Sequence, residues 1–178
     1  SLISILLRRL NQAKRIDKLV LATTTSNADN LLVTHVKSLG FDVYRGSEND
    51  VLTRYYQAAK KFKAKYVIRI TGDCPLIDSK LVDELIEKFI KNEVDYASNR
   101  EPATYPDGLD VEVISMQALE KAYNQADSDY QKEHVTPYFR ESGKFKILNI
   151  TNQDDLSDER WTVDEIDDFE LISTILNE

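Results

Sequence analysis

The chain has 178 residues, of which 42% are hydrophobic and 30% are charged. That length fits one domain with a sizeable core, which excludes a disulfide-stapled miniprotein and a disordered tail. The 23 lysines and arginines stand against 31 aspartates and glutamates, and the net charge of −8 argues against a partner bound through a nucleic-acid backbone.

The first half of the sequence alternates helical and strand patterns. Apolar residues recur every three or four positions in the helical segments, and short apolar runs typical of buried strands lie between them. In chain order we expect a helix at 2–10, a strand at 18–23, a helix at 31–39, a strand at 41–44, a helix at 51–62 and a strand at 66–70. Strands separated by single helices favour right-handed crossovers and a parallel sheet.

The second half is less regular. It predicts a helix over 81–89, strands at 94–98 and 109–114, helices at 116–125 and 130–139, strands at 145–150 and 160–163, and a closing helix at 167–176. No repeat, low-complexity tract or change of composition marks a linker. The sequence therefore predicts a single α/β domain over residues 1–178.

The cysteine and hydropathy patterns indicate the compartment. Cys74 is the only cysteine, so no internal disulfide and no cysteine-built zinc site can form. The longest apolar run, residues 2–7, is too short to span a membrane, and we expect no secretory leader before it. We expect a cytoplasmic protein with no membrane partner.

Asp73 is the most informative polar residue of the predicted strand ends. It lies in Thr-Gly-Asp-Cys-Pro at 71–75, directly after a strand, and ligands of open α/β sheets bind beyond the carboxyl ends of strands. A carboxylate in such a turn suits Mg²⁺, whereas the simpler alternative is that it accepts hydrogen bonds from turn amides. A second acid, Asp164, follows the strand at 160–163 and either joins Asp73 at the metal or caps the next helix.

Two other residues allow a structural and a functional interpretation. Arg69 lies in an apolar strand, so its guanidinium requires either a structural carboxylate or a substrate anion. His134 is more often structural than catalytic in such a setting, and nothing near it resembles a Ser-His-Asp set. Neither a P-loop nor G-x-G-x-x-G occurs, which excludes those two classes of phosphate site.

Five ordered motifs together closely resemble the spore coat polysaccharide biosynthesis cytidylyltransferases, relatives of the CMP-sialic acid and CMP-KDO synthetases. The motifs cover residues 45–54, 69–78, 105–113, 133–138 and 160–165. The resemblance implies a three-layer nucleotide-diphospho-sugar transferase (GT-A-like) fold with a mostly parallel mixed sheet. It also implies the reaction of CTP with a sugar or sugar acid to give a CMP-sugar and pyrophosphate, with Mg²⁺ as cofactor.

The resemblance also assigns residues to roles. Asp73 and Asp164 correspond to the metal-binding and catalytic aspartates, and Arg69, Thr71 and Gly72 would lie by the nucleotide, Arg69 with a catalytic role. Asp107, Gly108, Asp110, Glu112 and His134 would line the sugar side. A homodimer is expected from the relatives.

The sequence departs from the family pattern at its start. The family opens with a strand and a phosphate-binding loop of the type Q-A-R-x-x-S-x-R-L-P-x-K, whereas residues 1–3 already correspond to the helix that follows. The sequence thus resembles an N-terminally truncated member without the first strand of the sheet. Two alternatives to an active cytidylyltransferase stay open: a GT-A-type glycosyltransferase, and an inactive fragment acting as a scaffold or dimer module.

Overall fold

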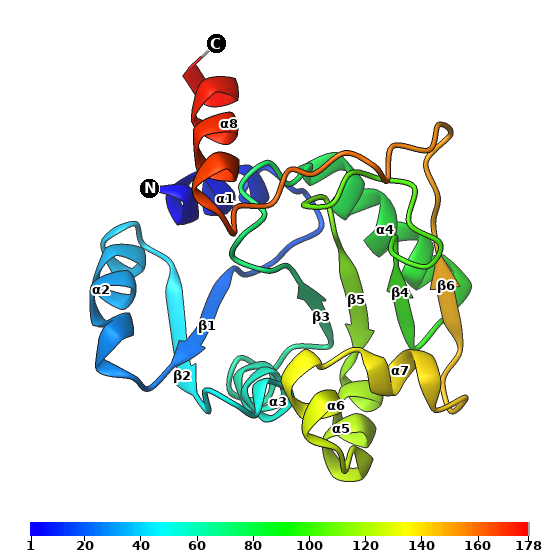
Figure 1. Ribbon diagram of the computed structural model, residues 1–178. Helices are drawn as coiled ribbons and strands as arrows, with labels where there is room; N and C mark the ends of the chain where they lie inside the picture. The colour runs from blue at the N-terminus through cyan, green and yellow to red at the C-terminus, as the bar shows by residue number, and fades with distance from the viewer. Residues whose placement is uncertain (178) are drawn as a thin grey trace.

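The computed structural model describes residues 1–177 and shows helices packed around two β-sheets (Figure 1). One sheet pairs β1 with β2, and the other has the strand order β3-β5-β4-β6. β1 and β2 are parallel, as are β4 and β6, whereas β5 is antiparallel to both β3 and β4. The elements, in chain order, are α1 (Leu2–Leu10), β1 (Val20–Thr24), the 3₁₀ helix η1 (Asn27–Asp29), α2 (Asn30–Ser38), β2 (Asp42–Gly46), α3 (Val51–Lys61), β3 (Tyr66–Arg69), α4 (Ser79–Asn92), β4 (Tyr96–Ser98), β5 (Glu112–Ser115), α5 (Met116–Gln125), α6 (Asp129–His134), α7 (Pro137–Glu141), β6 (Ile147–Asn149) and α8 (Ile166–Asn177).

Helices cover both faces of the four-stranded sheet. One core cluster joins α1 and α4 to one face, and a second joins α3, α5 and α7 to the other. Neighbouring residues of β5 divide between them: Val113 belongs to the first cluster and Ile114 to the second, because successive side chains of a strand point to opposite faces. The result is the three-layer mixed α/β fold predicted from the sequence.

Helix α4 shows how local sequence fixes the position of the loop before it. The carboxylate of Asp78 accepts the N–H of Lys80 at 2.8 Å and caps the helix, which ends where Glu93 adopts a left-handed conformation with φ of 49°. Its buried stripe consists of Leu81, Val82, Leu85, Ile86 and Phe89. This packing holds the loop between β3 and α4 against the sheet.

Two predicted elements are wrong. The helix expected at 130–139 is split into α6 and α7, because Pro137 has no N–H to donate and Val135, with φ of 68°, turns the chain between them. The strand expected at 160–163 forms only an isolated bridge between Arg160 and Asp107. Its backbone N–H groups bond to two different loops instead of one neighbouring strand.

The three strands predicted to lie in one parallel arrangement belong to different sheets. Among residues 1–177, β3 pairs with β5 and with neither β1 nor β2. Within the same residues no strand pairs with the second edge of β1 or of β3. No helix in the described part of the chain is both long and apolar enough to cross a bilayer.

Candidate active site

Three loops that are far apart in the sequence meet at one edge of the four-stranded sheet. The loop after β3 contains Asp73, whose carbonyl oxygen accepts the N–H of Val163 at 2.9 Å. The segment before β5 contains Asp107, whose carbonyl oxygen accepts the N–H of Trp161 at 2.7 Å. Residues 160–165 therefore lie alongside both loops and bring Asp164 beside the loop of Asp73.

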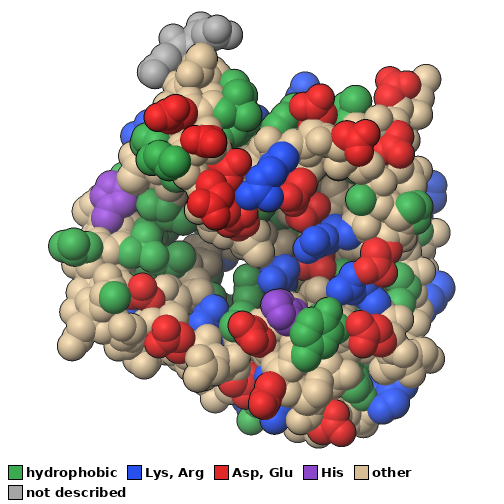
Figure 2. All heavy atoms as spheres, in the orientation of Figure 1, with side chains coloured by type: hydrophobic (Ala, Val, Ile, Leu, Met, Phe, Trp, Pro, Cys, Tyr) green, Lys and Arg blue, Asp and Glu red, His purple; other side chains and the backbone are tan. Residues whose placement is uncertain are grey.

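Arg160 forms ion pairs with three acidic side chains, one from its own segment, one from α8 and one from the segment before β5. Its guanidinium lies 2.7 Å from Asp164, 3.0 Å from Asp168 and 3.6 Å from Asp107. Figure 2 shows acidic side chains grouped around a basic one beneath α8, above a hollow near the centre of the view. The carboxylate of Asp168, in the first turn of α8, also accepts the N–H groups of Asp164 and Glu165, which precede the helix, and so stabilises its start.

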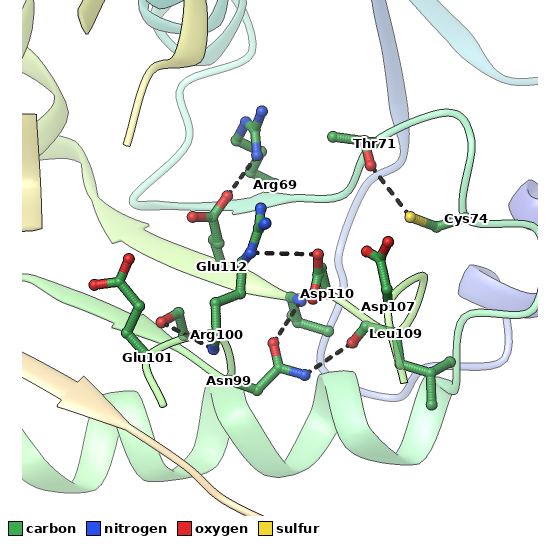
Figure 3. A network of polar contacts seen from close by, with 12 residues as sticks. Arg69, Thr71, Cys74, Asn99, Arg100, Glu101, Asp107, Leu109, Asp110 and Glu112 are labelled. Carbon is green, nitrogen blue, oxygen red and sulfur yellow. Dashed lines mark hydrogen bonds and ion pairs between the residues drawn. The ribbon is translucent and has the colours of Figure 1, made fainter. Parts of the chain in front are cut away.

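Two buried features, Gly108 and the side chain of Asn99 (the latter labelled in Figure 3), hold the segment before β5 in place. Gly108 has a φ of +105°, and a Cβ atom there would lie 2.7 Å from the carbonyl carbon of Trp161. Asn99, which follows β4, donates to the carbonyl of Leu109 and accepts the N–H of Val111, both at 2.9 Å. A buried amide that satisfies two backbone groups fixes the loop, because neither group has water as an alternative partner.

Asp73, Asp107 and Asp110 contribute to one negative region. Burial raises the pKa of Asp110, and the charges of Asp107, Glu112 and Asp73 raise it further, against the attraction of Arg100. Arg100 reaches Asp110 with its Nε at 3.3 Å. Among the described residues, the carboxylate of Asp73 accepts a hydrogen bond only from the thiol of Cys74, at 3.8 Å, and forms no ion pair. Asp73 is thus a carboxylate without a cation partner in this part of the chain.

Asp73 and Asp164 remain the predicted Mg²⁺ ligands. Carboxylate oxygens are the ligands that Mg²⁺ prefers, and the free carboxylate of Asp73 fits it. Asp164 is exposed, and its carboxylate would have to exchange Arg160 for the cation. Within residues 1–177 no three acidic, histidine or cysteine side chains are grouped so as to hold a metal ion. A cation here would take its remaining ligands from phosphate and water.

Arg69 and Glu112 form a buried ion pair across β3 and β5 (Figure 3). Nη1 of Arg69 donates to one carboxylate oxygen of Glu112 at 2.5 Å, and the hydroxyl of Tyr96 donates to the other at 2.5 Å. The Glu112 side chain is 2% exposed. Burial lowers the pKa of Arg69, but the charge of Glu112, the hydrogen bond to it and the nearby hydroxyls of Tyr55 and Tyr96 together outweigh burial, so the net pKa is raised. Both oxygens of Glu112 are therefore engaged inside the protein.

The remaining predicted residues lie in different surroundings. Thr71 contacts the Cys74 thiol at 3.2 Å, and burial raises the pKa of that thiol to about 12, so Cys74 stays protonated. Gly72 is exposed in the same loop. His134 is exposed on α6 with its ring 4.8 Å from that of Tyr130, and no polar contact links it to the other site residues. A shallow cavity of about 470 Å³ lies between the end of α1 and α4, and none of these residues lines it.

Sequence reasoning missed Arg100, Tyr96 and the part played by Arg160. Arg100 follows the carboxyl end of β4, and the rule that ligands bind beyond strand ends could have singled it out. Tyr96 lies in an apolar run, where nothing separates it from an ordinary core residue. Arg160 belongs to the motif at 160–165, but which acidic residues it pairs with depends on how the loops fold.

The comparison with known proteins decides the family. The family model of the cytidylyltransferases matches residues 1–165. This chain belongs to the cytidylyltransferase family. The match extends over α1 to the segment that carries Asp164 and ends just before α8.

Similar proteins agree with that assignment. This cytidylyltransferase is 42% identical to an uncharacterized protein of Methanocaldococcus jannaschii, over 96% of the chain and 70% of the relative. It is 32% identical to the spore coat polysaccharide biosynthesis protein SpsF of Bacillus subtilis, over 98% of the chain and 75% of the relative.

Two solved structures resemble the cytidylyltransferase fold seen here. A cytidylyltransferase of Leptospira borgpetersenii superimposes with a TM-score of 0.95 and 35% identity, covering 100% of this chain and 76% of that one. A CMP:2-keto-3-deoxy-manno-octonic acid synthetase complexed with CTP shares the fold, with a TM-score of 0.70, 14% identity and coverage of 99% and 87%. The enzyme class is therefore that of a nucleotidyltransferase.

Proposed function

We propose that this cytidylyltransferase transfers CMP from CTP to a sugar or sugar acid and releases pyrophosphate, for surface polysaccharide biosynthesis. The observation that carries the proposal is the hydrogen bond from Val163 to Asp73, because it brings the loops of both predicted metal ligands together. The relative named for spore coat polysaccharide biosynthesis and the synthetase of a CMP-linked sugar acid support a carbohydrate acceptor.

In this proposal the acidic and basic groups of the site have separate tasks. Asp73 and Asp164 would hold Mg²⁺, which when bound neutralises charge on the phosphates. Arg69, Thr71 and Gly72 would lie by the nucleotide. The sugar would bind on the side of Asp107, Gly108, Asp110 and His134.

The chemistry needs no protein nucleophile. A hydroxyl oxygen of the sugar attacks the α-phosphorus of CTP, and the bond to the pyrophosphate oxygen breaks. Cys74, the nearest thiol to Asp73, is 1% exposed and protonated, so it does not take part. A homodimer and a cytoplasmic location remain predictions.

Substitution of Asp73 tests the proposal. We expect Asp73→Asn to abolish Mg²⁺-dependent CTP binding in calorimetry while the circular dichroism spectrum is unchanged. Asp127→Asn is the matched control, because Asp127 is exposed and lies between α5 and α6, beyond the end of β5 opposite to the three loops. Unchanged CTP affinity in the Asp73 variant would contradict the metal role.

The turnover assay separates the reaction classes. The protein is mixed with CTP, Mg²⁺ and a panel of sugars and sugar acids, and pyrophosphate is measured. Pyrophosphate release that requires CTP and one acceptor supports the proposal. Consumption of a nucleotide-sugar without pyrophosphate would indicate the glycosyltransferase, and no reaction with either would indicate a non-enzymatic module.

A further inference from the structure

Arg69 is nearly buried yet makes few hydrogen bonds. Its side chain is 14% exposed, and it bonds to a single protein partner, Glu112, among the described residues. Its Nε is buried and has no partner. A guanidinium has five N–H donors in a fixed planar fork, and among the described residues those of Arg69 other than the one bonded to Glu112 have no protein acceptor.

The surroundings of Arg69 fix its orientation from three sides. Glu112 binds Nη1 from β5, and Tyr96 on β4 holds the far oxygen of Glu112. The ring of Tyr55, from α3, lies 5.8 Å from the centre of the guanidinium. Tyr96 is fully buried, and both strands are interior members of the sheet, so the frame is rigid.

Stability alone gives no reason for this ion pair. Two desolvated charges usually gain no more than well-packed apolar residues of the same volume would. The neighbouring positions on the same face are apolar: Ile114 on β5 is buried in the core, and the partly buried Val67 on β3 packs against it. This face of the sheet is therefore hydrophobic up to the Arg69–Glu112 pair, which lies at the edge where the three loops meet.

Charged side chains of both signs lie at that edge. Figure 3 shows Arg69 and Arg100 on either side of Glu112, with Asp110 and Asp107 farther toward Cys74. Arg100 is already paired with Asp110 at 3.3 Å. The side chain of Arg100 is 44% exposed, whereas that of Arg69 is 14% exposed and held by Glu112, so Arg69 is the desolvated guanidinium beside this negative region.

We propose that Arg69 is the receptor for an oxyanion of a substrate and that Glu112 and Tyr96 are positioning residues that hold its fork in place. This rests on the proposed function, in which the oxyanion is either a phosphate of CTP or the carboxylate of a sugar acid. Glu112, which the sequence placed on the sugar side, then acts through Arg69 and does not contact the sugar.

The test measures equilibrium binding of two ligands, CTP and 2-keto-3-deoxy-manno-octonic acid, by calorimetry. Tyr96→Phe removes one buried hydroxyl without creating a cavity, and Arg69→Lys keeps the charge but loses the fork. Arg69→Lys should weaken binding of the recognised ligand about tenfold or more, and Tyr96→Phe roughly three- to tenfold, because bonds to charged groups are the strong ones. Tyr123→Phe is the matched control, since Tyr123 is 37% exposed and stacks on Tyr56.

The outcomes are distinct. Loss confined to CTP identifies a phosphate, and loss confined to the acid identifies a carboxylate. Variants that melt at lower temperature but bind both ligands like the wild type would overturn the inference, as would a wild type that binds neither. Binding needs no turnover, so failure to release pyrophosphate refutes the proposed function and leaves this comparison intact.

Discussion

Gly108→Ala is expected to be strongly destabilising for two separable reasons. The backbone φ of +105° is unfavourable for any residue with a Cβ, at a cost of about 1–3 kcal/mol. The added Cβ would also lie 2.7 and 2.8 Å from the carbonyl carbon and oxygen of Trp161 and 2.9 Å from the nitrogen of Thr162. These are backbone atoms that cannot rotate away, and overpacking of this kind costs about 1–3 kcal/mol more.

The combined loss of about 2–6 kcal/mol converts to a fall in Tm of roughly 4–24 °C, at about 2–4 °C per kcal/mol for a domain of this size. Gly143→Ala supplies the control. Gly143 also has a positive φ, +67°, but no atom lies within 4 Å of the position of its Cβ. It should show backbone strain alone, about 1–2 kcal/mol.

Urea denaturation and thermal melts of both variants measure the difference. Because the contact with Trp161 forms part of the junction between the Asp107 and Asp164 loops, Gly108→Ala should also weaken Mg²⁺-dependent CTP binding, whereas Gly143→Ala should not. Equal loss of stability in the two variants would refute the reasoning, since it would show that the close approach to Trp161 contributes nothing.

Three further substitutions are expected to behave as follows. Asp110→Asn should raise the Tm at pH 7, because burial raises the pKa of Asp110 in the folded state, and the gain should vanish as the pH falls below about 3.9, the ordinary value. Asp168→Asn should lower the Tm at pH 7, because the hydrogen bond from Arg160 holds the pKa of Asp168 far below its ordinary value in the folded state. This loss of stability should shrink as the pH falls, and a loss that stays constant in melts from pH 3 to 8 would contradict the reasoning. Asn99→Ala leaves two buried backbone groups unsatisfied and should cost about 2–4 kcal/mol in urea denaturation, with a loss below about 1 kcal/mol counting against the clamp.

The spacing of apolar residues predicted most of the helices and strands, because their buried residues form regular stripes or short continuous runs. The apolar stripe of α4 and the apolar runs of β3 to β5 are buried, and the spacing of apolar residues in the sequence indicates this burial directly. The segment at 160–163 misled because Trp161 and Val163 alternate with polar residues as in a strand. Their N–H groups instead bond to the Asp107 and Asp73 loops, a choice made by tertiary contacts.

The sequence predicted which loops meet at the candidate site but not how their side chains pair. Strand ends and motifs indicated that Asp73 and Asp164 would approach one another, and the bond from Val163 places their loops together. Nothing in the sequence shows that Arg160 neutralises Asp164 or that Tyr96 completes the partners of Glu112. Such pairings depend on side-chain geometry across separate strands and loops, which local patterns do not encode.

The solitary thiol of this protein is a built-in reporter of motion in the loop that follows β3. Cys74 is 1% exposed and lies next to Asp73, so an alkylating reagent reaches it only while that loop is open. Its labelling rate with a maleimide therefore measures the opening equilibrium, free of signal from any other cysteine. A ligand that clamps the loop would slow the labelling, which offers a screen for compounds that occupy this edge without any knowledge of the acceptor.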